Sequence, residues 1–361
     1  MTTLTPTKRK KQVYETLKGL GTEIYDQMIR REFPWIKIPS RSIGNILYDE
    51  SYRQYILGNK SVKRSSRNIR HIRPLTQLVW AASFIKDLIK QNKTSTLRDI
   101  FYSAQAFEMN FVDQPESDNV LTDIETVIGY AREDFNVFPE ERSAIFGDLT
   151  IEYTVPGYEG RTLNLSSHPD GMMIGPALTN AEFKECNANK VIVIEKGALF
   201  TRFVEERVHD RFKAVLVQTT GQAPRATRGL IRRLSQELEL PVIILTDGDP
   251  WGMHIAMVII SGSANAAHLR ELNTPDAKWA GVWATDIVDY KLPSDPLNDL
   301  DIKRLYELRK DPRYDDKLWR REIDTFLKIK KKAEQEAFSR YGLTFIVDKY
   351  LPAKLKEMQI N

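Results

Sequence analysis

Apolar and polar positions follow helical spacing through most of the first third of the chain. Residues 11–31 place apolar side chains among charged ones and predict a first helix. A polar, basic connector is expected over 58–73. Pro74 is then expected to open an amphipathic helix, because proline suits the first helical position and apolar residues recur behind it every three or four positions.

Two further helices and two strands are expected next. Thr94 and Ser95 are suitable caps for a helix that begins near Thr96, and another helix is expected from about Asn119 to Phe135. The string SAIFGDLTIEYTVPG then predicts two short strands around a Gly-Asp turn. Three helices followed by a hairpin is the order of a winged-helix domain, a relative of the helix-turn-helix modules that dock in DNA grooves. Winged helices also bind proteins, so this order alone leaves the function open.

From about residue 188 the pattern becomes a regular alternation of strands and helices. Short apolar runs (VIVI, AVLVQ, VIIL and AGVW) are separated by amphipathic helical stretches, which indicates a parallel sheet covered on its faces. The remainder, about 297–361, is predicted to be mostly helical and highly charged. We therefore expect an α/β chain in four parts: a basic extension over 1–73, a winged-helix domain over 74–155, a linker over 156–187, and a Rossmann-like parallel-sheet domain with a helical C-terminal region over 188–361.

Composition and charge narrow the possible functions only modestly. The chain has 361 residues, a net charge of +4 and one cysteine, Cys186, so it can form neither an internal disulfide nor a cysteine-rich zinc site. No apolar run is long enough to span a membrane. The N-terminal string MTTLTPTKRKKQVYETL lacks the apolar core of a secretory signal, so we expect an intracellular, cytoplasmic protein.

Positive charge is concentrated in two segments near the N-terminus. One segment covers residues 8–11, and the other covers 60–73 and contains no acidic residue. Such patches suit contacts with phosphate, but a solvated basic loop is an equally good interpretation of composition alone.

Three carboxylates stand where two predicted parallel strands end. Glu195 directly follows VIVI, and Asp247 and Asp249 follow VIIL in an Asp-Gly-Asp turn. Ligands of parallel sheets bind beyond the carboxyl ends of the strands, and carboxylates without histidine or thiolate favour Mg²⁺. Each acid could instead cap the helix that follows, and for Asp249, which precedes Pro250, that alternative is serious. The three together favour a metal site that assists phosphoryl transfer.

A tyrosine is expected to project from the helix that begins near Thr96. At about 100° per residue, Leu97, Ile100, Phe101 and Ala104 share the core face, which directs Tyr102 outward. Arg98 lies four residues before Tyr102 and shares its face, where a guanidinium could bind a phosphate and favour the phenolate. Exposed tyrosines are common, so the residues alone give only a weak case for a nucleophile.

Several strings together resemble the DNA-cleaving A chains of the archaeal type IIB topoisomerase family. They are TLRDIFYSAQ, VIVIEKGALF, TTGQAPRATRGLIRRL, LTDGDPWG, KWAGVW, KKAEQEAF and YLPAKLKEM, in order across about residues 70–361. The resemblance implies that Tyr102 is the nucleophile, and that Glu195, Asp247 and Asp249 bind Mg²⁺ in a Toprim domain, a small parallel α/β fold. It also implies a supporting role for Arg228, which ends the element that starts at Gly221.

The resemblance further implies the partners and the reaction. Two copies would bind double-stranded DNA, each tyrosine would form a 5′-phosphotyrosyl link, and a second duplex would pass through the break before resealing. The tyrosine of one protomer would meet the metal site of the other. A separate B subunit would carry the ATPase in an A2B2 assembly, which agrees with the lack of a nucleotide-binding glycine loop in this sequence. Residues 1–73 match less clearly and are expected to help bind that partner.

Three other functions fit parts of the pattern. A related meiotic transesterase makes the break without resealing it. A Toprim-type nuclease would use water in place of Tyr102. A non-catalytic winged-helix protein would use the carboxylates only as helix caps. Covalent trapping of DNA and ATP-dependent decatenation distinguish these alternatives.

Overall fold

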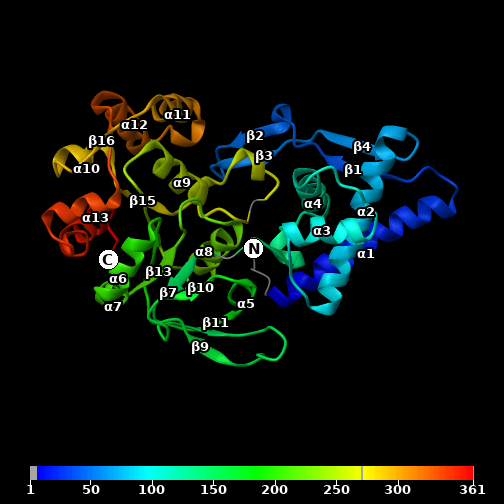
Figure 1. Cartoon of the computed structure of the whole chain (residues 1–361), viewed down its shortest axis with the longest axis horizontal. Coiled ribbons are helices and arrows are strands. Elements are labelled where there is room, and N and C mark those ends of the chain that lie inside the picture. Colours follow the sequence, from blue (N-terminus) through cyan, green and yellow to red (C-terminus); the bar gives the residue numbers. More distant parts are fainter. Residues whose placement is uncertain (1–5, 141, 270, 361) are drawn as a thin grey trace.

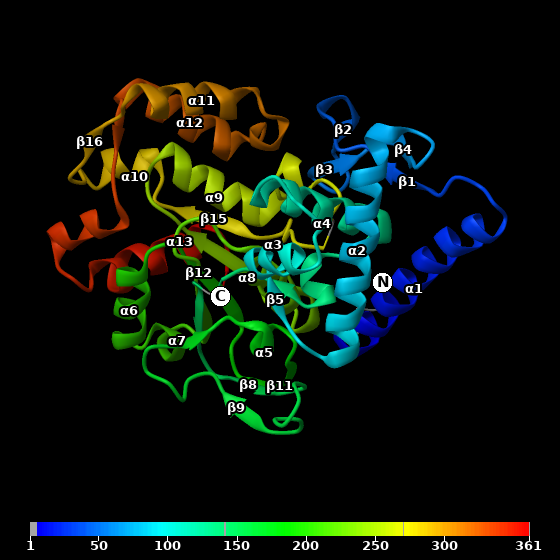
Figure 2. The same ribbon diagram turned by 45° about the vertical axis from the view of Figure 1, so that its right-hand side comes forward.

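The computed structural model describes residues 6–140, 142–269 and 271–360, so the first five residues of the expected N-terminal extension lie outside the described part. The chain forms two lobes, an N-terminal one rich in helices and a larger one built on a sheet (Figure 1). Four helices make up most of the first lobe: α1 (Pro6–Ile29), α2 (Ile69–Gln91), α3 (Leu97–Ala106) and α4 (Gln114–Ile128). Their apolar faces share one core, and α1 lies along α2 (Figure 2).

The helix boundaries differ from the expected ones where a side chain caps a helix. The helix predicted over 11–31 is confirmed. The predicted connector over 58–73 is wrong, because it contains a strand and because Asn68 caps α2 by accepting a hydrogen bond from the backbone of Arg70 at 3.0 Å. Helix α2 therefore begins before Pro74. Helix α4 begins earlier than expected because Asp113 caps it, and it ends at Gly129, whose φ of 75° is left-handed.

Short strands complete the first lobe and link it to the second. Strand β1 (Trp35–Pro39) pairs antiparallel with β4 (Ser61–Ser65), β2 (Ile46–Asp49) with β3 (Gln54–Leu57), and β5 (Ser95–Thr96) pairs parallel with β6 (Val137–Phe138). The β2–β3 hairpin reaches the second lobe, where the Tyr55 hydroxyl donates to Asp311 at 3.2 Å (Figure 1). The N-terminal extension is thus folded and bridges both lobes.

The two strands predicted around Gly147 form, but they do not pair with each other. Strand β7 (Ala144–Phe146) joins the large sheet beside β13 (Ala214–Gln218), whereas β8 (Leu149–Glu152) lies in a three-stranded sheet between β11 (Glu182–Cys186) and β9 (Thr162–Asn164). Gly147 has a φ of 149°, and its α-carbon packs so close to Ala214 and Val215 that a β-carbon would lie 3.0 Å from their backbone. The chain therefore changes sheets here. The three predicted helices α2–α4 are confirmed, and the expected hairpin of the winged helix is wrong.

The predicted parallel sheet is confirmed. Its strand order is β10-β7-β13-β12-β14-β15, in which the last four strands are parallel: β13, β12 (Lys190–Ile194), β14 (Val242–Leu245) and β15 (Lys278–Gly281). The central strands are buried along their whole length, as expected for a sheet with helices on both faces. The other elements of the sheet region are β10 (Met172–Met173), α5 (Pro176–Thr179), α6 (Gly197–Glu205), α7 (Val208–Arg211), α8 (Arg225–Glu237), α9 (Pro250–Ser261) and α10 (Ala284–Asp289).

The C-terminal region is mostly helical, as predicted. It contains α11 (Asp299–Lys310), α12 (Lys317–Ile329) and α13 (Leu351–Glu357), and a short antiparallel pair of β16 (Asp295–Pro296) and β17 (Lys331–Lys332). The segment after β17 folds back against β14, because Gly248 and Ala333 exchange backbone hydrogen bonds at 2.8 and 3.0 Å. Among the described residues, no helix is both long and apolar enough to cross a membrane.

A buried ionic cluster joins the two lobes. Its centre is Glu125 of α4, which has no exposed surface and accepts from Arg132 at 3.0 Å, from Arg225 of α8 and from His268 at 3.2 Å. Burial alone would raise the pKa of the Glu125 carboxyl, but the Arg225 charge and the His268 and Arg132 hydrogen bonds hold it well below its usual value. This acid is ionised and fully paired, and it ties the lobes together.

Candidate nucleophile and metal centre

Tyr102 projects from α3, a helix whose start is fixed by local hydrogen bonds. Thr96 and Asp99 form a capping box: the Thr96 hydroxyl accepts from Asp99 N at 3.0 Å and the Asp99 carboxylate from Thr96 N at 3.1 Å. The cap is Thr96, which follows the predicted caps Thr94 and Ser95, and the helix begins at Leu97. Ile100 is buried on the core side, as predicted, and Tyr102 is 50% exposed.

Arg98 and Tyr102 meet on the exposed face of α3. The guanidinium carbon of Arg98 lies 5.7 Å from the centre of the Tyr102 ring, and its hydrogen bond with the Tyr102 hydroxyl raises the pKa of Arg98. The predicted pairing of these side chains is present in the structure. A guanidinium held beside a solvent-accessible phenol can bind a phosphate where the oxygen would attack.

Glu195 and Asp247 stand beside each other at the carboxyl edge of the parallel sheet. The Glu195 Oε2 accepts a hydrogen bond from the backbone N–H of Asp247 at 3.0 Å, across the neighbouring strands β12 and β14. Burial and the nearby Asp247 charge raise the pKa of Glu195 to about 7. Burial also raises the pKa of Asp247 to about 6, even though it accepts a hydrogen bond from Gln335 and contacts Lys196. The positive charge of Lys196 is therefore not enough to offset the effect of burial on these two carboxylates.

Asp249 has the capping role that the sequence left open. Its Oδ1 accepts from Gly252 N at 2.6 Å and so begins α9, while burial raises the pKa of the carboxyl. The glycines around it are required by close approach. A β-carbon on Gly252 would lie 2.2 Å from the Asp247 carbonyl oxygen, and one on Gly248 would lie 3.1 Å from that of Ala333. The turn is therefore packed tightly enough to fix both aspartates.

The structure adds two acids and a lysine that the sequence reasoning missed. Asp247, Glu334 and Glu336 offer carboxylate oxygens within 4.8 Å of one another, a grouping able to hold a metal ion. Lys196 lies between Asp247, at 3.0 Å, and Glu334. Gln335 N donates to Asp247 Oδ1 at 3.0 Å and so fixes this segment beside β14. The string KKAEQEAF contributes to the family resemblance, but the spacing of its acids carries no signal that they lie near Asp247.

The donor set fits a hard divalent cation. All the candidate ligands are carboxylate oxygens at one edge of the sheet, and the raised pKa values of Glu195 and Asp247 indicate that the negative charge of these two acids is incompletely compensated. Mg²⁺ binds through a few carboxylates and keeps waters or substrate phosphates at its other positions, so it is the cation that these residues suit best.

Arg228 and two arginines of the basic segment over 60–73 are engaged within the fold and do not contact the three acids. Arg228 is 5% exposed at the lobe interface, burial lowers its pKa to about 10, and the charged groups that act on it are Arg225 and Glu133 rather than the three acids. In the basic segment, Arg64 pairs with Asp123 at 2.6 Å and Arg73 with Glu116 at 2.8 Å. These two arginines serve the fold of the first lobe.

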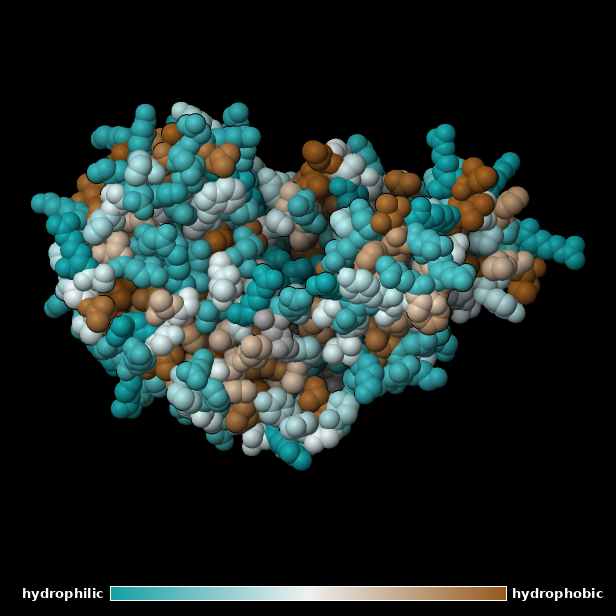
Figure 3. Space-filling model, viewed as in Figure 1, coloured by the Kyte–Doolittle hydropathy of each residue, from teal (hydrophilic) through white to brown (hydrophobic). Residues whose placement is uncertain are grey.

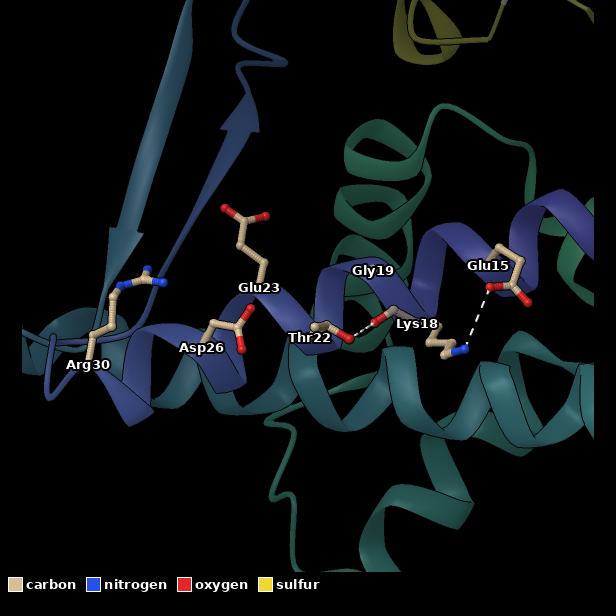
Figure 4. A pocket seen from close by; sticks show the side chains of 7 residues that line it. All are labelled: Glu15, Lys18, Gly19, Thr22, Glu23, Asp26 and Arg30. Atoms are coloured by element: carbon tan, nitrogen blue, oxygen red, sulfur yellow. Dashed lines mark hydrogen bonds and ion pairs between the residues drawn. The ribbon is translucent and has the colours of Figure 1, made fainter.

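Two hollows on the surface of the described residues lie away from the acids. One runs along α1 and is lined by residues of that helix and by Arg30, which directly follows it; here Lys18 approaches Glu15 at 3.8 Å (Figure 4). The face in Figure 3 is also hollowed between the two lobes, where hydrophilic side chains gather.

Comparison with known proteins identifies both lobes. Residues 190–355 match the family model for the Toprim domain of the topoisomerase 6 A chain and Spo11, and residues 73–137 match that of "Type IIB DNA topoisomerase". The chain is 44% identical over 353 residues to the type 2 DNA topoisomerase 6 A chain of Methanothermobacter thermautotrophicus, which covers 97% of this chain and 99% of the relative. The same protein of Archaeoglobus fulgidus is 36% identical over 97% of the chain and 99% of the relative, and that of Halobacterium salinarum 37% identical over 99% of each. The chain belongs to the family of type 2 DNA topoisomerase 6 A chains, the DNA-cleaving components of type IIB DNA topoisomerases.

Proposed function

We propose that Tyr102 is the nucleophile with which this protein opens double-stranded DNA. The observation that carries the proposal is the Tyr102 side chain, half exposed on a capped helix and held beside Arg98. The phenol oxygen forms a bond to phosphorus, the bond from phosphorus to the 3′ oxygen breaks, and the phenol proton ends on that oxygen. The phosphotyrosyl ester conserves the energy of the broken bond, so resealing needs no further cofactor.

We propose that Glu195, Asp247 and Asp249 hold the Mg²⁺ that assists this step. When bound, Mg²⁺ neutralises charge on the phosphate oxygens. Glu195 supplies a partly buried carboxylate and Asp247 a buried one, both with incompletely compensated charge, and the packed Asp-Gly-Asp turn orients Asp247 and Asp249. Arg98 binds the phosphate beside the attacking oxygen. Arg228 acts indirectly, from the buried contact between the lobes.

The working assembly that we propose is a dimer joined to two B subunits. Tyr102 and the acids lie on different lobes, and the contacts of Tyr102 described above are with its own helix, which agrees with a tyrosine that serves the metal centre of the other protomer. Helices α2–α4 would dock on the duplex as a winged-helix-type module. The B subunit would supply ATP hydrolysis in an A2B2 assembly that relaxes and decatenates DNA, and the DNA substrate would keep the assembly at the nucleoid.

The test is covalent trapping of DNA. The chain is incubated with supercoiled DNA and Mg²⁺, with and without ATP plus the B partner, and then denatured. Protein-linked 5′ ends are expected for the unaltered chain and for Tyr158→Phe, a matched change at a tyrosine that is 54% exposed. Tyr102→Phe should abolish the linked ends and leave DNA binding intact. Protein-linked DNA from the Tyr102→Phe variant would refute the assignment.

A further inference from the structure

We propose that Trp251 and Arg304 form a contact that holds the free 3′ end of the cleaved strand beside the metal centre. This inference rests on the function proposed above and names a binding site for one of its products.

Trp251 stands at the rim of the acidic centre on a rigid element. It follows Asp249 by two residues and lies in the first turn of α9, whose start is set by the Asp249 cap at 2.6 Å. Its side chain is 47% exposed, whereas Trp279, Trp283 and Trp319 are buried. A large aromatic surface left in solvent beside a ligand site, and held there by a helix cap, is positioned to receive something.

Arg304 lies over this ring from a separate helix. Its guanidinium carbon, on α11, is 5.1 Å from the centre of the Trp251 ring. Its Nη1 donates to Glu307 at 3.0 Å, and its Nε is buried. The pair therefore presents an aromatic face and a cation together, the two groups that bind bases and phosphates of a single strand.

Positive charge continues along the same edge of the site. Lys332 of β17 lies near Asp249, where its charge opposes the rise that burial produces in the pKa of that carboxyl, and it donates to Asp301 at 2.8 Å. Lys330 and Lys331, which precede it, are exposed. A phosphate backbone approaching Asp249 would thus meet positive charge beside that acid.

The chemistry of the reaction requires such a grip. When tyrosine attacks, the 5′ side becomes covalently attached to protein, but the 3′-hydroxyl side has no covalent link. Faithful resealing needs that hydroxyl to return to the same phosphorus, so its strand must be held by non-covalent contacts near the metal. Trp251 and Arg304 are the described side chains that combine stacking surface and charge at this place.

Fluorescence quenching tests the contact without any cleavage. In a Tyr102→Phe background, a duplex with one nick that bears a 3′-hydroxyl is added and acrylamide quenching is recorded. Bound DNA should shield a tryptophan component that is absent from Trp251→Phe. Trp251→Ala should bind the nicked duplex about 5- to 150-fold more weakly, the range for loss of one stacked base. Trp251→Phe keeps a ring and should weaken binding less, which guards against simple misfolding.

Tyr306→Ala is the matched control, because Tyr306 is 52% exposed and lies two residues beyond Arg304 on the same helix. It should leave both shielding and affinity unchanged. DNA that binds without shielding Trp251 would overturn the proposed contact, even if covalent trapping by the unaltered protein succeeds. Failure of covalent trapping would instead contradict the proposed function. Trapping and shielding therefore test the function and the contact separately.

Discussion

Glu125 at the lobe interface is buried and the acids at the sheet edge are buried or partly buried, yet their pKa values move in opposite directions. Glu125 is surrounded by Arg132, Arg225 and His268, and its pKa is held well below the usual value. Glu195 and Asp247 share Lys196 at most, and their pKa values rise to about 7 and about 6. Burial is common to both regions, so the difference lies in the supply of cations. The fold supplies Glu125 with counter-charges, whereas Glu195 and Asp247, the acids that we propose for the metal site, are left short of them.

Removing the charge at the lobe interface should have the largest effect. Glu125→Gln leaves Arg132 and Arg225 buried without their anion, so the free energy of unfolding should fall by about 3–5 kcal/mol. Denaturant unfolding of the full chain measures the change. A loss below about 1 kcal/mol would show that the Glu125 cluster does not stabilise the fold more than an exposed ion pair does.

Neutralising an acid at the sheet edge should keep the protein folded but remove its DNA-cleaving activity. Asp247→Asn should lower Mg²⁺-dependent DNA cleavage by about 100-fold or more, a typical loss for one electrostatic group at a reaction centre. Its unfolding free energy should change by no more than about 1 kcal/mol, since the contact with Lys196 is partly exposed. Cleavage is read from denatured reactions and stability from unfolding curves, and undiminished cleavage would contradict the metal role.

The raised pKa values predict a pH dependence of the metal-free protein. Glu195 binds its proton more tightly in the folded state, because burial raises its pKa from 4.5 to about 7. That contribution to stability is fully present below pH 4.5 and is lost as the pH rises through about 7. The rise in Tm that Mg²⁺ produces should therefore be larger at about pH 8 than at about pH 6, where protons compete for the site. Equal shifts at both pH values would argue against these carboxylates as ligands.

Asp249 allows its two roles to be separated with the smallest change in stability. Asp249→Asn keeps a side-chain acceptor for Gly252 N and should unfold like the unaltered chain, yet it should still lose Mg²⁺-dependent cleavage. Asp249→Ala removes the cap as well and should cost about 1 kcal/mol. If the two variants retained equal, full activity, Asp249 would be only a cap.

The sequence carried the elements and residues whose signals are local. The apolar runs predicted β12 to β15, the acids directly after them mark the sheet edge, and helical spacing placed Tyr102 outward beside Arg98. The family resemblance supplied the proposed nucleophile and the proposed metal ligands, for which local chemistry gave only a partial case.

What the sequence did not reveal depends on pairing between distant segments. Gln335 reaches Asp247 across 88 residues, so Glu334 could not be assigned to the site by spacing. Glu125 lies 100 residues from Arg225 along the chain. The partner of β7 is β13 rather than β8, because Gly147 turns the chain into another sheet, and no short-range pattern distinguishes that turn from a hairpin.

Strand β7 also constrains how this protein can be divided or recombined. Residues 144–146 cover one side of β13 with antiparallel hydrogen bonds, although they precede β12 by more than forty positions. A fragment that starts at the first parallel strand would expose the backbone of β13 as a new sheet edge, which favours intermolecular pairing and aggregation. Exchange of domains between relatives should therefore succeed when the junction lies before β7, because β7 then stays in the same fragment as β13 and remains paired with it.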